Sequence, residues 1–375
     1  MLARLIILLL LAFFTEFYIF FRYLRKKCQW RTQVLYFVFT LLCVVMIGLM
    51  LKQYYTSESV AAVYQSSMLI CAILTMFACK FAFSIVDVWS LLIKKKIIKV
   101  FAAGFAAFCL FVSAYGVLFG RFNMTPKYIT VENETLPKSF EGYKVLQISD
   151  WHFVSLYGDE KKVSEWVDMM NAENPDIICF TGDIITVLSD EMLPFMDALK
   201  RLNAKDGKYA IFGNHDFGHY HNWAFRETNL KHIAKMDSLI KETGFEVLHN
   251  EHRTICKSGD SIAVVGMDEW DLSKIGKKIS VDTRILLAHD PDFWNLDIDD
   301  SSDYFLTLSG HTHAMQIGLE FGDWETSFAA LRFPYWHGLY KRNGKQLIAN
   351  RGIGCTVIPI RFGMSPEYIV VTLKK

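Results

Sequence analysis

Long apolar runs at the start of the chain restrict its fold more than any other feature of the sequence. Four of them precede Arg121, at about 5–21, 34–51, 68–93 and 97–119. Each is long enough to cross a bilayer, which takes roughly 20 helical residues. A soluble protein would need far more polar chain to cover four such runs, and no small-residue cleavage site marks the first as a signal peptide. The sequence therefore predicts a domain of four transmembrane helices.

Basic residues are distributed unequally among the loops that join these runs. Nine Lys and Arg residues lie in the first and third loops, whereas the second loop contains only Lys52. Lys and Arg in short loops mark the cytoplasmic side, so both basic loops are predicted to be cytoplasmic. The N-terminus and everything after Phe119 would then be external, although Arg4, Arg121 and Lys127 favour the opposite orientation.

Three ionisable residues, Glu16, Lys80 and Asp87, lie inside the predicted spans. Charges in hydrocarbon are costly, so they are usually paired or functional. Lys80 and Asp87 share one helix face, and an interhelical pair involving Glu16 is one arrangement that would satisfy them. We expect contacts that pack the bundle or reach the membrane interface, and a transport pathway is the alternative.

Charge and cysteine spacing exclude several other classes of protein. The formal net charge is +1 at pH 7, and no basic stripe is interleaved with aromatic residues, so we expect no nucleic-acid partner. Of the 8 cysteines, Cys179, Cys256 and Cys355 follow the apolar runs and are widely spaced. This spacing is typical neither of a disulfide framework nor of a thiolate zinc site.

After a short linker, apolar runs that suit strands alternate with amphipathic segments that suit helices, at about 160–171, 192–202 and 230–243. Five of the predicted strands end in Asp, Asn or His. In sheets covered by helices, sites gather outside the carboxyl ends of the strands, so we expect these side chains to meet at one rim. The five predicted strands, each with the polar residues that follow it, are 145–149 with Asp150 and His152, 177–180 with Asp183, 208–212 with Asn214, His215 and Asp216, 284–288 with His289, and 304–308 with His311 and His313.

The chemistry of these side chains indicates metal binding. Carboxylates, imidazoles and one amide, without cysteine, suit divalent manganese, iron or zinc. The set is too large for one ion, so two neighbouring ions are predicted.

In this order, the motifs resemble the signature of the calcineurin-like metallophosphoesterases. The resemblance extends from about residue 144 to the C-terminus, and the closing segment 352–367 resembles the membrane-anchored bacterial branch of that family. It implies a four-layer α-β-β-α sandwich with two facing sheets, helices outside and metals at one rim. Many membrane-anchored relatives have two glycines where this chain has Ala314 and Met315, so we expect a different loop beside the metals.

The resemblance also implies a role for each residue of the motifs. Asp183 would bridge both metals, and a bridging water or hydroxide would be the nucleophile. The other ligands would be Asp150, His152 and His313 for the first metal, and Asn214, His289 and His311 for the second.

His215 would contact the substrate phosphate or protonate the leaving oxygen, and Asp216 would orient His215. Asn214 would also contact substrate, and Arg361 would either touch the phosphate or form a structural ion pair. Further residues are candidates for the wall of a pocket, with ordinary surface roles as the alternative: His219, Tyr220, His221, Asp268 and Trp270.

These features predict a four-helix transmembrane domain over 1–122, a linker and first strand over 123–143, and a metallophosphoesterase domain over 144–375. The predicted function is a two-metal phosphohydrolase at the membrane surface, acting on a phosphate ester or pyrophosphate of a lipid-linked small molecule among membrane lipids. One alternative is a pyrophosphatase of the UDP-diacylglucosamine type, which requires a cytoplasmic domain. Another is a membrane sensor with a vestigial hydrolase domain, which the complete ligand set argues against.

Overall fold

The computed structural model describes residues 2–375 except 224, 269–278, 298–303 and 323. The chain forms two compact units, which are described separately. The first contains Met1–Tyr54 and Gln65–Leu118, and the second contains Tyr55–Tyr64 and Phe119–Lys375. The short connection between two long apolar helices therefore belongs with the second unit.

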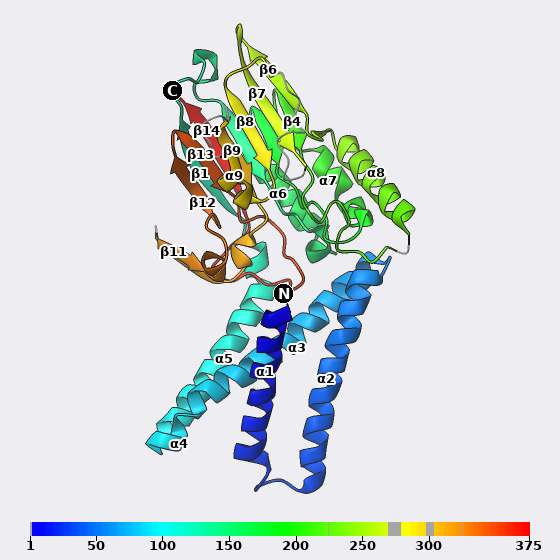
Figure 1. Cartoon of the computed structure of the whole chain (residues 1–375), viewed down its shortest axis with the longest axis vertical. Coiled ribbons are helices and arrows are strands. Elements are labelled where there is room, and N and C mark those ends of the chain that lie inside the picture. Colours follow the sequence, from blue (N-terminus) through cyan, green and yellow to red (C-terminus); the bar gives the residue numbers. More distant parts are fainter. Residues whose placement is uncertain (1, 224, 269–278, 298–303, 323) are drawn as a thin grey trace. The chain divides into compact units, whose positions relative to one another are not determined.

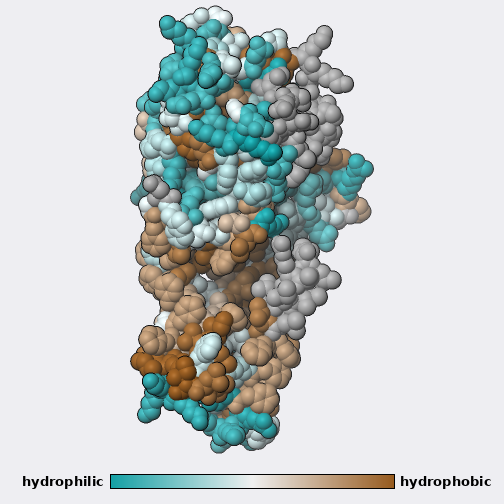
Figure 2. Space-filling view, turned by 60° about the vertical axis from the view of Figure 1, so that its left-hand side comes forward, coloured by the Kyte–Doolittle hydropathy of each residue, from teal (hydrophilic) through white to brown (hydrophobic). Residues whose placement is uncertain are grey.

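The first unit is helical (Figure 1). Its helices are α1 (Leu2–Ile19), α2 (Trp30–Thr56), α3 (Val60–Asp87), α4 (Ser90–Ile93) and α5 (Lys96–Leu118). Three stretches of the described chain are long and apolar enough to cross a membrane: Trp30–Thr56, Val60–Ile93 and Lys96–Phe122. Apolar side chains gather on the surface of these helices in Figure 2, whereas the visible surface of the second unit is largely hydrophilic.

Charges inside the first unit are paired. Lys80 lies 2.9 Å from Glu16, which is one of the arrangements that the sequence left open, and the Thr40 hydroxyl also donates to Glu16. Asp87 accepts hydrogen bonds from Tyr18 and from other hydroxyl groups of the unit. These contacts satisfy the charges within the bundle, as hydrocarbon surroundings require.

Two six-stranded sheets and a hairpin form the second unit. The first sheet has the order β1-β14-β2-β3-β4-β5, the second has the order β12-β13-β9-β8-β7-β6, and β10 pairs with β11. The bounds are β1 Thr125–Glu132, β2 Lys144–Ile148, β3 Ile177–Phe180, β4 Gly207–Ala210, β5 Glu246–Val247, β6 His252–Lys257, β7 Asp260–Met267, β8 Arg284–Ala288, β9 Tyr304–Ser309, β10 Gly318–Phe321, β11 Trp324–Ser327, β12 Gly338–Arg342, β13 Lys345–Ala349 and β14 Glu367–Lys374.

Successive side chains along the strands belong alternately to two different hydrophobic cores of the second unit. Val145 of β2 belongs to the core between the two sheets, whereas its neighbour Leu146 belongs to the core under the helices. Successive side chains of a strand point to opposite faces, so both faces of β2 are covered. The core under the helices, which contains Leu146, also includes side chains of α6 (Glu160–Ala172), α7 (Met196–Lys200) and α8 (Arg226–Glu242). Short helical segments cover the outer face of the second sheet, where Phe293 packs on β7 and β8 and Trp294 of α9 (Trp294–Asp297) packs on Leu347 of β13, and the fold is the predicted α-β-β-α sandwich.

One predicted helix has a different form. The segment expected to be helical from about residue 192 begins as a 3₁₀ stretch over Ser189–Phe195 and becomes α-helical only at Met196. Pro194 explains the change, because proline lacks the N–H that an α-helix interior needs.

The strands that carry the motifs run in one direction. In the first sheet β2, β3 and β4 are parallel, and in the second β7, β8 and β9 are parallel. Their carboxyl ends therefore lie on one rim of each sheet, which brings the motif residues together.

Candidate metal centre

A first candidate ligand set consists of Asp150, His152, Asp183 and His313. Their ligand atoms lie within 4.8 Å of one another, and all four residues are buried. All four have positive φ angles, between 41° and 57°. Such angles are uncommon for residues other than glycine and gather at functional sites, where the surrounding structure holds them.

The distances in this set fit a metal ion. The Nε2 atoms of His152 and His313 are 3.0 Å apart, and His313 Nε2 is 3.2 Å from Asp150 Oδ1. Two neutral imidazoles can share only one proton at such a contact, whereas both lone pairs can face one cation. Two carboxylates and two imidazoles are also the chemistry that borderline divalent ions prefer.

A second candidate ligand set shares Asp183 with the first. His289 Nε2 is 3.0 Å from Asp183 Oδ2, and His311 Nδ1 is 2.9 Å from Asn214 Oδ1. The Thr181 carbonyl accepts a hydrogen bond from His289 Nδ1, which leaves Nε2 directed toward the site. The shared carboxylate is what two neighbouring ions would require.

Electrostatics keep the shared carboxylate ionised. Burial alone would disfavour its charge, but the surrounding imidazoles, above all His289, hold the pKa of Asp183 well below its ordinary value. Asp183 Oδ1 also accepts a hydrogen bond from the backbone N–H of His215, 2.9 Å away. The ligand that both sets need is therefore available in its charged form.

His215 lies beside both sets, and its Nδ1 donates to the Thr186 carbonyl at 2.6 Å. Nε2 is then the nitrogen free for proton transfer. Its ring meets His152 edge-on and stacks on Tyr220, whose centroid is 4.1 Å away. Burial lowers the pKa of His215, which favours the neutral imidazole near pH 7.

Asp216 has a different role from the predicted one. Its carboxylate accepts hydrogen bonds from the backbone N–H groups of Asp183, Ile184 and Ile185, and from that of Gly213. It therefore fixes the turns that carry the ligands, and Thr186 orients His215 instead. Adjacency in sequence was the basis of the prediction, and the two side chains leave the turn in different directions.

Arg361 does not face the site as a substrate ligand. It is fully buried, and its guanidinium donates to the carbonyl oxygens of Gly354, Met364 and Arg351. Its Nη2 also lies 3.3 Å from His313 Nδ1. Arg361 thus supports His313 from behind, and its described partners include no carboxylate of the kind the ion-pair alternative required.

Tyr220 supports the second set, which the sequence did not reveal. Its hydroxyl accepts a hydrogen bond from Asn214 Nδ2 at 3.1 Å, so Asn214 Oδ1 remains directed toward His311. No spacing rule links this tyrosine to the asparagine, because the contact depends on how the loop after β4 folds back.

The loop after His311 departs from ordinary backbone geometry. His313, Ala314, Met315 and Gln316 all have positive φ angles, between 47° and 63°. Glycine adopts this conformation without strain. The side chains of Ala314 and Met315 thus occupy a turn that favours glycine, at the positions where the sequence departs from the family pattern.

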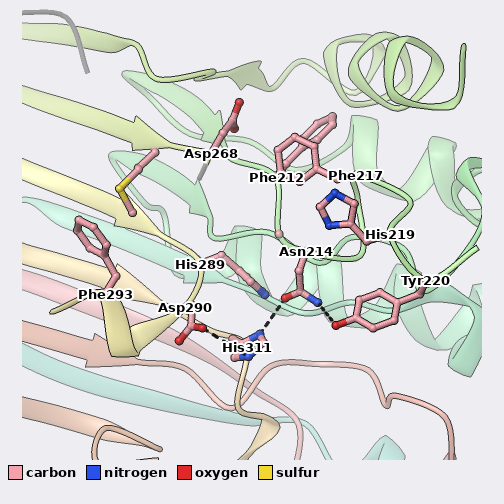
Figure 3. A pocket seen from close by; sticks show the side chains of 12 residues that line it. Phe212, Asn214, Phe217, His219, Tyr220, Asp268, His289, Asp290, Phe293 and His311 are labelled. Carbon is pink, nitrogen blue, oxygen red and sulfur yellow. Dashed lines mark hydrogen bonds and ion pairs between the residues drawn. The ribbon is translucent and has the colours of Figure 1, made fainter. Parts of the chain in front are cut away.

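A cavity of about 320 Å³ opens beside the second set (Figure 3). Of the predicted pocket residues, His219, Tyr220 and Asp268 line it, His221 is not among its described lining residues, and Trp270 lies outside the described residues. The lining is Phe212, Gly213, Asn214, Phe217, His219, Tyr220, Met267, Asp268, His289, Asp290, Phe293 and His311.

Comparison with known proteins agrees with this geometry. The family model described as calcineurin-like phosphoesterase matches residues 143–315. The uncharacterized metallophosphoesterase YkuE of Bacillus subtilis (strain 168) is 32% identical over 266 residues, which are 65% of this chain and 84% of that protein. This chain belongs to the calcineurin-like phosphoesterases.

Other similar proteins differ more. A transmembrane protein with metallophosphoesterase domain from Danio rerio is 27% identical over 287 residues, which are 71% of this chain and 62% of that protein. The structure of Haemophilus influenzae NAD nucleotidase (NadN) is similar with a TM-score of 0.36 at 17% identity, over 56% of this chain and 45% of that chain. Family membership and the buried Asp and His residues make the chain a metal-dependent phosphoesterase, and its apolar helices indicate membrane association.

Proposed function

We propose that this protein is a two-metal phosphohydrolase that four transmembrane helices anchor in the membrane, where it hydrolyses a phosphate ester or pyrophosphate bond of a lipid-linked substrate. The observation that carries the proposal is Asp183, which is shared by two sets of candidate ligands; all of them but His311 are buried. The ions would be manganese, iron or zinc, since the ligands are carboxylates, imidazoles and an amide.

When bound, the two ions would supply an activated water and neutralise charge on the phosphate oxygens. The side chains of the protein hold the metal ligands in place, and His215 supplies the proton for the leaving oxygen. Asp216 and Arg361 hold the ligand turns, while Thr186 holds the His215 ring so that Nε2 is free. A phosphate at the centre favours protonated His215, which can then give its proton to the leaving oxygen.

The position of the second unit along the chain supports a substrate at the membrane surface. The segment Tyr55–Tyr64, which joins two candidate spans, is part of the catalytic unit. Within that unit, the Tyr55 carbonyl accepts a hydrogen bond from the backbone N–H of Asn222, and the Tyr64 ring packs 5.6 Å from that of Tyr157. Asn222 is two residues from Tyr220, so within this unit the segment Tyr55–Tyr64 is hydrogen-bonded to the loop that carries Tyr220.

The same connection supports an external catalytic unit. Both α2 and α3 meet the second unit at Tyr55–Tyr64, and α5 continues into it at Phe119. If each helix crosses the membrane once, their other ends, with the basic segments 22–31 and 94–99, lie on the opposite side. Those segments hold nine Lys and Arg residues, which favour the cytoplasm. The accessible substrates would then be lipid-linked phosphates of the outer leaflet or envelope.

A substrate screen with the detergent-solubilised protein tests this function. The protein, supplied with manganese, iron or zinc, is assayed for phosphate release from lipid phosphates, nucleotides and UDP-diacylglucosamine, with Asp183→Ala as the inactive control. We expect lipid phosphates to be preferred. Preference for UDP-diacylglucosamine would favour the cytoplasmic alternative, and two bound metals without hydrolysis of any substrate would favour a sensor.

A further inference from the structure

The hairpin of β10 and β11 turns apolar side chains away from the protein. It lies outside both six-stranded sheets (Figure 1). Phe321 pairs with Trp324 across the two strands, and Leu319 lies two residues before Phe321, so the three side chains share one side of the hairpin. Leu319, Phe321 and Trp324 are 45%, 68% and 55% exposed. We call these three side chains the hairpin face.

The other side of the hairpin carries carboxylates that bind the rest of the second unit. Glu320 and Glu325 pair across the strands on that side. Glu320 lies 3.0 Å from the buried Arg351 and 2.7 Å from Lys127. Glu325 lies 2.6 Å from Nδ1 of His337. These contacts hold the polar side of the hairpin inward, so the hairpin face is directed outward.

This arrangement is the reverse of the usual one. An antiparallel sheet of a water-soluble domain packs its apolar side on the core and leaves its polar side in water. The short helical segment Phe328–Leu331 follows β11 directly and adds two exposed apolar side chains, Phe328 at 64% and Leu331 at 86%. Large apolar side chains that gather at a surface in this way mark contact with another apolar surface.

The residue types favour lipid as that surface. Trp is enriched where hydrocarbon meets the lipid headgroups, and Trp, Phe and Leu are the side chains that peripheral segments bury in this layer. Exposed Arg332 directly follows Leu331, and its guanidinium suits lipid phosphate groups.

A second copy of this chain fits the hairpin face less well. A stable protein interface buries roughly 800 Å² on each partner. A wholly covered aromatic side chain buries roughly 150–250 Å², and those of the hairpin face are already partly covered. The hairpin face alone therefore falls short of the area that a stable dimer needs, whereas a bilayer requires no matching shape.

The chain also keeps the hairpin within reach of the membrane. One candidate span ends at Phe122, and Lys127, which binds Glu320 of the hairpin, is five residues further along the chain. Five extended residues reach at most about 18 Å. The attachment point of the hairpin therefore lies close to the end of a span by covalent connection alone.

We propose that the hairpin face docks in the interfacial layer of the membrane, so that the second unit binds lipid through its own side chains in addition to the spans. The docking would hold the metal centre beside lipid, because the ring of Phe333, two residues after Leu331, lies 6.0 Å from the ring of His311. Only this consequence for the substrate rests on the proposed function, and the docking itself does not.

Fluorescence of labelled cysteines in the full-length protein tests the docking. In a Cys256→Ser background, Phe321→Cys or Leu331→Cys carries a polarity-sensitive thiol fluorophore, and the protein is reconstituted in phosphatidylcholine vesicles. Part of the lipid is then replaced by lipid brominated in the upper part of its acyl chains, which quenches fluorophores in the interfacial layer. We expect blue-shifted emission and a loss of intensity with brominated lipid at both positions.

Matched controls define the baseline. The background protein without an added cysteine gives the signal of the remaining cysteines, which is subtracted. Cys256 of the unaltered protein, exposed on the edge strand β6, should give water-like emission that brominated lipid leaves unchanged. Phe321→Ser/Trp324→Ser should reduce the quenching at Leu331→Cys, whereas Tyr128→Ser, which removes a 65% exposed ring from β1, should not.

The possible outcomes decide between lipid, protein and water as the neighbour of the hairpin face. Water-like, unquenched emission at Phe321→Cys overturns the proposal. Blue-shifted emission that brominated lipid does not quench also overturns it, because protein, such as a second copy of the chain, then covers the face. Quenching at Leu331→Cys that persists unchanged in Phe321→Ser/Trp324→Ser refutes the role of the hairpin face.

The test is independent of catalysis and of the serine variant. Should Phe321→Ser/Trp324→Ser not fold, quenching at Phe321→Cys remains decisive. No readout requires hydrolysis, so a protein that docks but hydrolyses no substrate refutes the proposed function and supports the docking. A protein that hydrolyses lipid phosphates while Phe321→Cys stays in water refutes the docking and leaves the phosphohydrolase intact.

Discussion

Tyr220→Phe removes one hydroxyl that supports a metal ligand while keeping the ring. That hydroxyl accepts from Asn214 Nδ2 at 3.1 Å, and the ring stacks on His215 at 4.1 Å between centroids. Without the hydroxyl, the Asn214 amide can rotate, and its oxygen faces the second ligand set for only part of the time. The first ligand set contains neither residue, so the second metal should weaken selectively.

The structure bounds the size of this effect. The hydrogen bond joins two neutral groups, and Tyr220 is 41% exposed, so water can replace part of the lost contact. A neutral hydrogen bond contributes about 0.5–1.5 kcal/mol, which corresponds to roughly 2- to 10-fold in affinity. We therefore expect the second metal to bind about 2- to 10-fold more weakly and the first to be unchanged.

Competitive titration with a metal-sensitive chelator measures both affinities on the solubilised protein. Tyr128→Phe is the control, because Tyr128 is also exposed and its hydroxyl donates to Glu173 away from the site. Tyr220→Leu, which also removes the stacked ring, should lower turnover further through His215. Equal weakening of both metals, or an unchanged second metal in Tyr220→Phe, would refute the role assigned to the hydroxyl.

Three further predictions concern catalysis, topology and pH. His215→Ala should retain both metals yet lose about 10²- to 10⁴-fold in turnover, whereas Asp183→Ala should lose metal, as metal analysis would show; the reverse pattern contradicts the assigned roles. In a background with the exposed Cys256 replaced by serine, Glu134→Cys should react with a membrane-impermeant thiol reagent in intact cells, and labelling only after lysis would make the catalytic unit cytoplasmic. Burial opposes the charge of His337, but Glu367 and Glu325 raise its pKa from 6.5 to about 9. The charged imidazole therefore stabilises the folded protein fully below pH 6.5, and this contribution to the free energy of unfolding is lost as the pH rises toward 9. The fall in thermal midpoint over that range should flatten in His337→Gln, and an unchanged slope would count against this ion cluster.

The identity and order of the candidate ligands followed from the sequence alone. Apolar runs marked the buried strands, and five of these runs were followed by Asp, Asn or His, which parallel strands bring together at one rim. The first predicted helix, 160–171, also agrees closely with α6 (Glu160–Ala172), since its apolar spacing matches one helix face. These features depend on residue type and spacing, which the sequence contains directly.

Only the tertiary structure decided which partner each polar side chain has. Asp216 is next to His215 in the chain but bonds the turn after β3, and Thr186 holds the imidazole instead. Arg361 could be read as a phosphate ligand until its burial behind His313 was visible. The orientation of Asn214 depends on Tyr220, which a folded loop brings across the site. Hydrogen bonds form between atoms that meet in space with the right direction, and the order of residues along a chain fixes neither the meeting nor the direction.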